Sequence, residues 1–218
     1  TYFVVKSGFT KGGQPLLSAL LTILIVAPMG PYLYRIAFQP IADATVLTLL
    51  IAAVGVHLAM TGLGLVFFGA ESLRAEPLSS ASMNVGPMLV SGQSIGIYVI
   101  TIALIVGLYL FFENTLYGKA LRATAVSRFG ARIVGIRTSL SGRIAFALAT
   151  VVGVISGILI VPITTVYYDT GFIIGLKGFV AAIIAGLASY PLTAIAALLV
   201  GIVEAFSSFF ASDYKEVI

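Results

Sequence analysis

Five long stretches of the sequence contain no Asp, Glu, Lys or Arg, and they constrain the fold more than any other feature. They cover residues 12–34, 44–70, 77–112, 144–168 and 178–203. An α-helix needs about 20 mostly apolar residues to cross the hydrocarbon core of a bilayer. Only 9% of the 218 residues are charged, which is too few to give a soluble domain a polar surface. The sequence therefore predicts an all-α, polytopic membrane protein.

Turn signals subdivide two of these stretches. The first part of 77–112 lacks apolar continuity, so we expect a loop with a short hairpin and a spanning helix from about Ser94. The Ser189-Tyr190-Pro191 turn divides the last stretch into a short helix over about 172–188 and a longer one over about 192–210. Six membrane-inserted helices result, of which the short one is either re-entrant, half-spanning or a full crossing.

The basic residues predict the orientation. Six of the twelve Lys and Arg residues lie in one segment: Lys119, Arg122, Arg128, Arg132, Arg137 and Arg143. The positive-inside rule places this segment, bounded at 113–143, in the cytoplasm. The loop at 69–93 and the start of the chain then lie outside, and the turn at 35–43 lies inside. The net charge of +4 thus reflects loop placement, and we expect no nucleic-acid partner.

Several chemistries are excluded by missing residues. The sequence has no cysteine, and its single histidine has no Ser or carboxylate partner at a recognisable spacing. No cluster has metal-ligand spacing. No Gly-x-x-x-x-Gly-Lys-[Ser/Thr] phosphate loop occurs, since Gly118-Lys119 is followed by Ala. We therefore expect no enzyme activity, no catalytic residues, and no metal or cofactor bound by this chain.

Residues 117–137, between two predicted spans, form the most informative segment. Leu121, Ala125, Phe129 and Ile133 recur every four residues and give one apolar stripe on a helix or helix pair, with basic residues on the other faces. Small residues in this segment would let another surface approach the backbone closely. Composition leaves two interpretations open: a basic helix lying on anionic lipid, or a helix that docks a cytoplasmic partner.

Two sequence stretches resemble a known family. The run Gly118-Lys-Ala-Leu-Arg-Ala-Thr-Ala125, followed ten residues later by Gly135-Ile136, is similar to the cytoplasmic loop of LivH/LivM-type permeases. These are membrane subunits of ABC importers for branched-chain amino acids and related solutes. Residues 175–191 resemble the family's Leu-Lys-aromatic-small element that ends in Gly, Ser and Pro. The importers' Glu-Ala-Ala motif, with a Gly four residues later, matches here only at Ala131 and Gly135.

The resemblance runs from about residue 65 to the end and implies an alternating-access permease domain over 1–218. It implies cytoplasmic ATPase subunits that hold ATP and Mg²⁺, a second permease subunit (homologous or identical), an extracytoplasmic solute-binding protein, and a bacterial or archaeal cytoplasmic membrane with its lipid. It also implies further helices before and after this chain, which begins without Met. The implied ATPase-coupling residues are Gly118, Ala120, Leu121, Arg122, Ala123, Phe129, Ala131 and Gly135.

Two alternative functions remain open from the residues themselves. One is an ion-coupled secondary transporter or channel. The other is a membrane scaffold with a lipid-binding basic helix.

Four ionisable residues within or beside the apolar stretches are candidates for a substrate path. His57 is more simply a neutral side chain bonded to a neighbouring helix than a proton relay. Lys177 and Glu204 either form an ion pair that fixes helix packing or extend separately to an interface. Asp169 is more simply a loop carboxylate than a partner for a substrate ammonium.

Glycine spacing predicts close helix packing. Gly92 with Gly96, and Gly153 with Gly157, form Gly-x-x-x-Gly pairs of the kind that let membrane helices approach. The Pro28-Met-Gly-Pro31 run predicts a kink in the first span.

Overall fold

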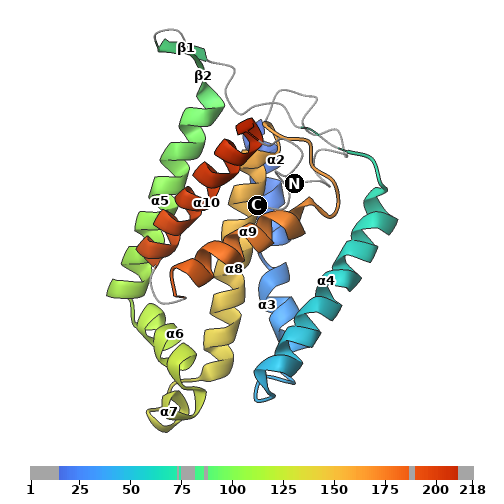
Figure 1. Ribbon diagram of the computed structural model, residues 1–218. Coiled ribbons are helices and arrows are strands. Elements are labelled where there is room, and N and C mark those ends of the chain that lie inside the picture. Colours follow the sequence, from blue (N-terminus) through green and yellow to red (C-terminus); the bar gives the residue numbers. More distant parts are fainter. Residues whose placement is uncertain (1–14, 73, 75–81, 86–87, 187–189, 211–218) are drawn as a thin grey trace.

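The computed structural model describes residues 15–72, 74, 82–85, 88–186 and 190–210 (Figure 1). Its first half contains α2 (Pro15–Val26), α3 (Met29–Leu33), the π-helix η2 (Tyr34–Phe38), α4 (Val46–Phe68), β1 (Ser82–Val85) and β2 (Met88–Ser91). Its second half contains α5 (Gly92–Asn114), α6 (Leu116–Val126), α7 (Arg128–Ile133), α8 (Thr138–Ile160), α9 (Thr170–Ile184) and α10 (Tyr190–Phe210). The predicted all-α class is confirmed, with one short hairpin in the described part.

Among the residues that the structure describes, five helical stretches are long and apolar enough to cross a membrane: Ala19–Phe38, Leu47–Phe68, Gly92–Asn114, Thr138–Ile160 and Pro191–Phe210. The sixth predicted helix is α9, whose 15 residues make it a shorter apolar helix. At 1.5 Å per residue it is about 22 Å long, less than the roughly 30 Å of the hydrocarbon core. The chain is therefore a multi-pass membrane protein, and α9 is an apolar helix shorter than its spans.

The predicted loops lie at opposite ends of the molecule. Figure 1 shows α6 and α7 at one end, where the connection from η2 to α4 also lies, and the β1–β2 hairpin at the other. The two strands pair antiparallel, with Ser82 opposite Ser91 and Val85 opposite Met88. The start of the chain and most of 73–81 lie outside the described residues. The predicted orientation requires residues 35–43 and 113–143 to lie on the same side of the membrane. In the structure both segments lie at the same end of the molecule.

Helix α8 is the centre of the bundle, with α2, α3, α5, α6 and α7 packed on it. Its contact with the first span depends on small residues. A Cβ at Gly30 would lie 2.0 Å from Oγ1 of Thr150, and one at Gly142 would lie 2.1 Å from the Tyr34 ring. Tyr34 is consequently only 2% exposed, and its ring packs against that of Phe146.

The first span is kinked, as the sequence predicts. Helix α2 ends at Val26, α3 begins at Met29, and the π-helix continues to Phe38. At two of the four Gly-x-x-x-Gly positions the structure shows no close approach of another helix, because a Cβ at Gly96 or Gly153 would meet open space. Close helix approach occurs instead at glycines without that spacing, where a bulky ring or a hydroxyl stands opposite.

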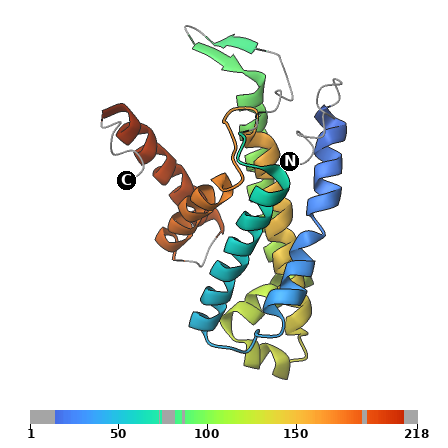
Figure 2. The same cartoon turned by 90° about the vertical axis from the view of Figure 1, so that its right-hand side faces the viewer.

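Helices α9 and α10 form a hairpin beside the bundle (Figure 2). Helix α9 packs along α10, and α10 packs against α5. A left-handed glycine, Gly186 with φ +69°, follows α9 at the turn that the sequence predicts. Residues 187–189 of that turn lie outside the described residues.

Candidate coupling surface and substrate path

The chain passes from α5 into α6 through a turn that only glycine fits. Thr115 donates its hydroxyl to the carbonyl of Phe111 at 2.6 Å and accepts the amide of Gly118 at 3.0 Å. A Cβ at Gly118 would lie 2.4 Å from that carbonyl oxygen. The α6 backbone is therefore held directly against the end of α5.

Ser127 divides the coupling segment into two helices. Its extended backbone (φ −154°, ψ 112°) ends α6, and its hydroxyl caps α7 by accepting the amide of Gly130 at 3.1 Å. The predicted stripe is split by this break, because Leu121 is buried whereas Phe129 and Ile133 are 77% and 70% exposed. The segment is therefore a helix pair that presents part of its apolar stripe to the outside.

Four large apolar side chains between residues 126 and 134 of this helix pair are strongly exposed. We call Val126, Phe129, Ile133 and Val134 the apolar tip; each is at least 70% exposed. The tip lies on the polar segment between two spans, at the end of the molecule where α6 and α7 project (Figure 1). Contiguous exposed apolar patches outside the bilayer mark interaction sites. The tip is thus a candidate docking surface.

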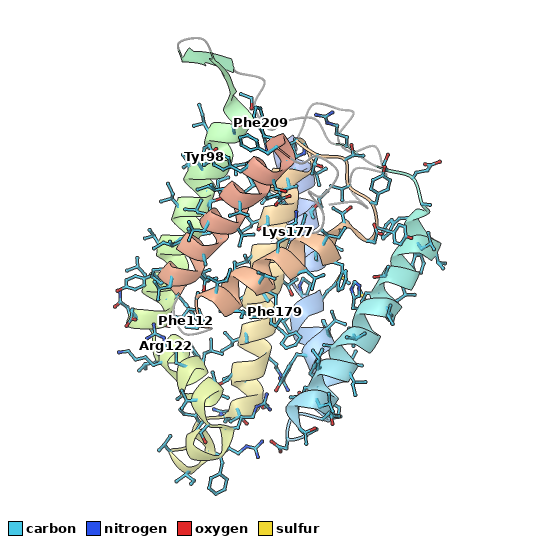
Figure 3. All side chains as sticks on the ribbon, viewed as in Figure 1. Tyr98, Phe112, Arg122, Lys177, Phe179 and Phe209 are labelled. Carbon is cyan, nitrogen blue, oxygen red and sulfur yellow. The ribbon has the colours of Figure 1, made fainter. Side chains whose placement is uncertain are left out.

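The predicted coupling residues fall into two groups. Gly118, Leu121 and Ala131 are buried within the chain and Ala120 and Ala123 are half-buried, whereas Arg122, Phe129 and Gly135 are exposed. The buried residues hold the helix pair in place, and the exposed ones are available to a partner. Arg122, labelled in Figure 3, pairs with Glu113 at 2.7 Å and fastens α6 to the end of α5.

Gly135 has a backbone role that the sequence did not reveal. Its φ is +84°, a left-handed conformation that favours glycine, and a Cβ there would meet open space. The amide of Gly135 donates to the carbonyl of Arg132, and the amide of Ile136 donates to that of Ala131, closing the end of α7.

Three arginines join the helix pair and α8 to the loop before α4. Arg128 donates to the Ala42 carbonyl at 2.6 Å, Arg132 pairs with Asp43 at 2.6 Å, and Arg143 donates to Gln39 at 3.4 Å. We call this set the arginine clamp. The sequence predicted these arginines as an orientation signal and as the polar faces of a basic helix, without partners in the chain. The one available hint was Asp43, the acidic residue in an inner turn that faces a basic segment.

The four candidates for a substrate path lie on α4, on α9, on α10 and just before α9. Lys177 in the middle of α9 forms an ion pair with Glu204 of α10, one of the two predicted arrangements, and their side chains are 46% and 42% exposed. Figure 3 shows Lys177 between the two helices. His57 stacks on Phe172 at the start of α9, with ring centroids 4.4 Å apart. Asp169 is exposed just before α9.

A bundle of apolar spans with a folded, arginine-rich helix pair between two of them defines a multi-pass membrane protein with a candidate docking surface at one end. Residues 2–218 match the family described as branched-chain amino acid transport system / permease component, and the chain belongs to this family. The predicted resemblance is confirmed. The family consists of transport permease components and not enzymes.

Individual relatives carry the same description. The high-affinity branched-chain amino acid transport system permease protein LivH of Salmonella typhimurium is 26% identical over 204 residues, and so is LivH of Escherichia coli K12. BraD of Pseudomonas aeruginosa is 25% identical over 206 residues. The matches cover 90% of this chain and 66% of each relative, so the chain spans about two thirds of their length. No solved structure matches the chain.

Proposed function

We propose that this chain is the permease component of an ABC importer that moves branched-chain amino acids or related small polar solutes into a bacterial or archaeal cell. The observation that carries the proposal is the apolar tip, four exposed side chains on the polar segment between two apolar spans. The family description and the relatives' names support the substrate class.

A separate ATPase would bind ATP and Mg²⁺ and receive the apolar tip in a groove. Its closure would move the helix pair as a unit, because the Ser127 cap and the α7 closure hold the two helices together. The movement would reach α5 through the contact at Gly118 and the loop before α4 through the arginine clamp. With a second permease subunit, these shifts would open a central path alternately to each side. A solute-binding protein would deliver solute at the β1–β2 end.

The arginine contacts favour protein docking over lipid binding. Four of the six basic residues in the coupling segment bond to acceptors of the chain itself: Arg122, Arg128, Arg132 and Arg143. A helix that held anionic lipid would need those groups free for phosphates. Within the described residues, the pattern therefore suits a rigid element that transmits force.

Co-purification of the full-length protein with its ATPase tests the proposal, with wild type compared with Phe129→Asp and Leu116→Asp. Both positions are exposed and apolar, but Leu116 lies at the start of α6, away from the tip. We expect wild type and Leu116→Asp to retain stoichiometric ATPase and Phe129→Asp to lose it while remaining monodisperse. A wild type without any ATPase would overturn the importer proposal. ATP-independent uptake would favour a secondary transporter.

A further inference from the structure

The ion pair between Lys177 and Glu204 lies where charged groups are costly. Lys177 is the eighth of the 15 residues of α9, and Glu204 is six residues before the end of α10. About half of each charged side chain is exposed. Ionisable residues within membrane spans almost always face a bundle interior or a water-filled cavity, because hydrocarbon does not solvate them. The exposed side of this pair is therefore not expected to face lipid.

The crossing that carries Lys177 is interrupted. Since α9 alone is too short to span the bilayer, part of the crossing falls to the irregular segment at residues 161–169. Exposed polar groups occur along it, among them Thr164, Thr165 and Asp169. Non-helical backbone at membrane depth is tolerated where it is covered by protein or lines water. Interrupted helices of this kind line substrate paths in transporters.

Lys177 has aliphatic neighbours on its own face of α9. Ile173 and Val180, one turn before and after Lys177, are each about half exposed. A small solute with an aliphatic side chain would thus find apolar contacts next to the pair.

We propose that the Lys177–Glu204 pair lines the aqueous substrate path and holds a small zwitterionic solute in transit. The solute's carboxylate would bind Lys177 and its ammonium would bind Glu204, in place of the bond between the two side chains. When a zwitterion replaces the Lys177–Glu204 bond, all four charges stay paired. A solute with only one charge would leave either Lys177 or Glu204 without a counter-charge in a site that water solvates poorly. The inference rests on the proposed import function and names the residues that contact the solute.

Cysteine accessibility tests the position of the pair and leaves both charged residues intact. The 218 residues contain no cysteine, so Val180→Cys can be placed beside Lys177 in the full-length transporter, freed of any cysteine elsewhere. Leu198→Cys, an exposed apolar position on α10, is the matched control. We expect a charged, water-soluble methanethiosulfonate to modify Val180→Cys but not Leu198→Cys. An unreactive Val180→Cys would overturn the inference.

Protection by solute tests the binding role. We expect saturating L-leucine to slow the modification of Val180→Cys. We expect no protection by 4-methylpentanoate, which lacks the ammonium, or by 3-methylbutylamine, which lacks the carboxylate. Modification that leucine does not slow, or that the singly charged analogues slow equally, would overturn the zwitterion assignment.

A neutral double variant separates solute binding from helix packing. Lys177→Met with Glu204→Gln keeps side-chain volume and removes both charges, so a purely structural pair would be replaced at little cost. We expect the variant to retain its ATPase partner while leucine uptake falls roughly tenfold or more, because two charge-assisted hydrogen bonds to the solute are lost. Unchanged uptake would overturn the inference. Loss of the ATPase from wild type itself would instead count against the proposed function.

Discussion

Gly118 shows how a single residue can fix a functional element. Replacement by Ala would place a Cβ 2.4 Å from the Phe111 carbonyl oxygen, where only backbone movement could relieve the clash. We expect Gly118→Ala to lower the free energy of unfolding by about 1–3 kcal/mol, the usual cost of overpacking. The measurement is thermal unfolding in detergent.

The control for that variant is Gly107→Ala on α5, where a Cβ would meet open space. It should be neutral or stabilising by up to about 1 kcal/mol through helix propensity. Equal destabilisation by both variants would contradict the assignment of Gly118 to the contact between α5 and α6.

Gly135 is constrained by its backbone conformation and not by its surroundings. At φ +84° an Ala side chain is strained, whereas Asn tolerates the left-handed region better. We expect Gly135→Ala to cost about 1 kcal/mol or more of stability and Gly135→Asn to cost less. Thermal unfolding of the two variants checks this order. If Ala and Asn were equally harmless, closure of α7 would not depend on the glycine.

At the scale of elements, the arginine clamp is expected to act on coupling more than on stability. The side chains of Arg132 and Asp43 are 49% and 68% exposed, and exposed ion pairs contribute only about 0–1 kcal/mol. Helix α4, however, packs on its neighbours mainly through η2, so the loop before α4 is an important connection to the coupling helices.

We therefore expect Arg132→Asp to leave the melting temperature nearly unchanged and to reduce solute uptake per ATP hydrolysed several-fold. The charge-exchanged double variant, Arg132→Asp with Asp43→Arg, should recover most of the coupling ratio. Both quantities can be measured in proteoliposomes that contain the assembled transporter. A double variant as uncoupled as the single one would show that Arg132 acts through some contact other than Asp43.

At the scale of the whole molecule, the sequence predicted what depends on composition and missed what depends on geometry. The apolar stretches gave the spans, and the Ser189-Tyr190-Pro191 turn gave the short helix, because hydrophobic length and turn residues act locally. The ion pair at Lys177 was predictable because few charges lie near these helices. The contact of Tyr34 with Gly142 and the arginine clamp were missed, since they join residues about a hundred positions apart that no local pattern connects.

The whole-molecule arrangement also predicts which positions are accessible from each side of the membrane. Ser139 follows the coupling helices, Ser72 lies in the loop before the hairpin, and Phe209 lies near the end of α10. Figures 1 and 3 show the α10 end, with Phe209, toward the hairpin end of the molecule. This position requires residues 161–184 to complete a full crossing between α8 and α10.

In right-side-out vesicles, we expect Ser72→Cys and Phe209→Cys to react with an impermeant maleimide without permeabilisation. Ser139→Cys should react only after permeabilisation, because the positive-inside rule predicts a cytoplasmic location for the basic segment. If Phe209→Cys behaved like Ser139→Cys, α9 would be a half-spanning element that returns to its own side. The pair at Lys177 and Glu204 would then lie close to an interface, and its exposure would need no aqueous path.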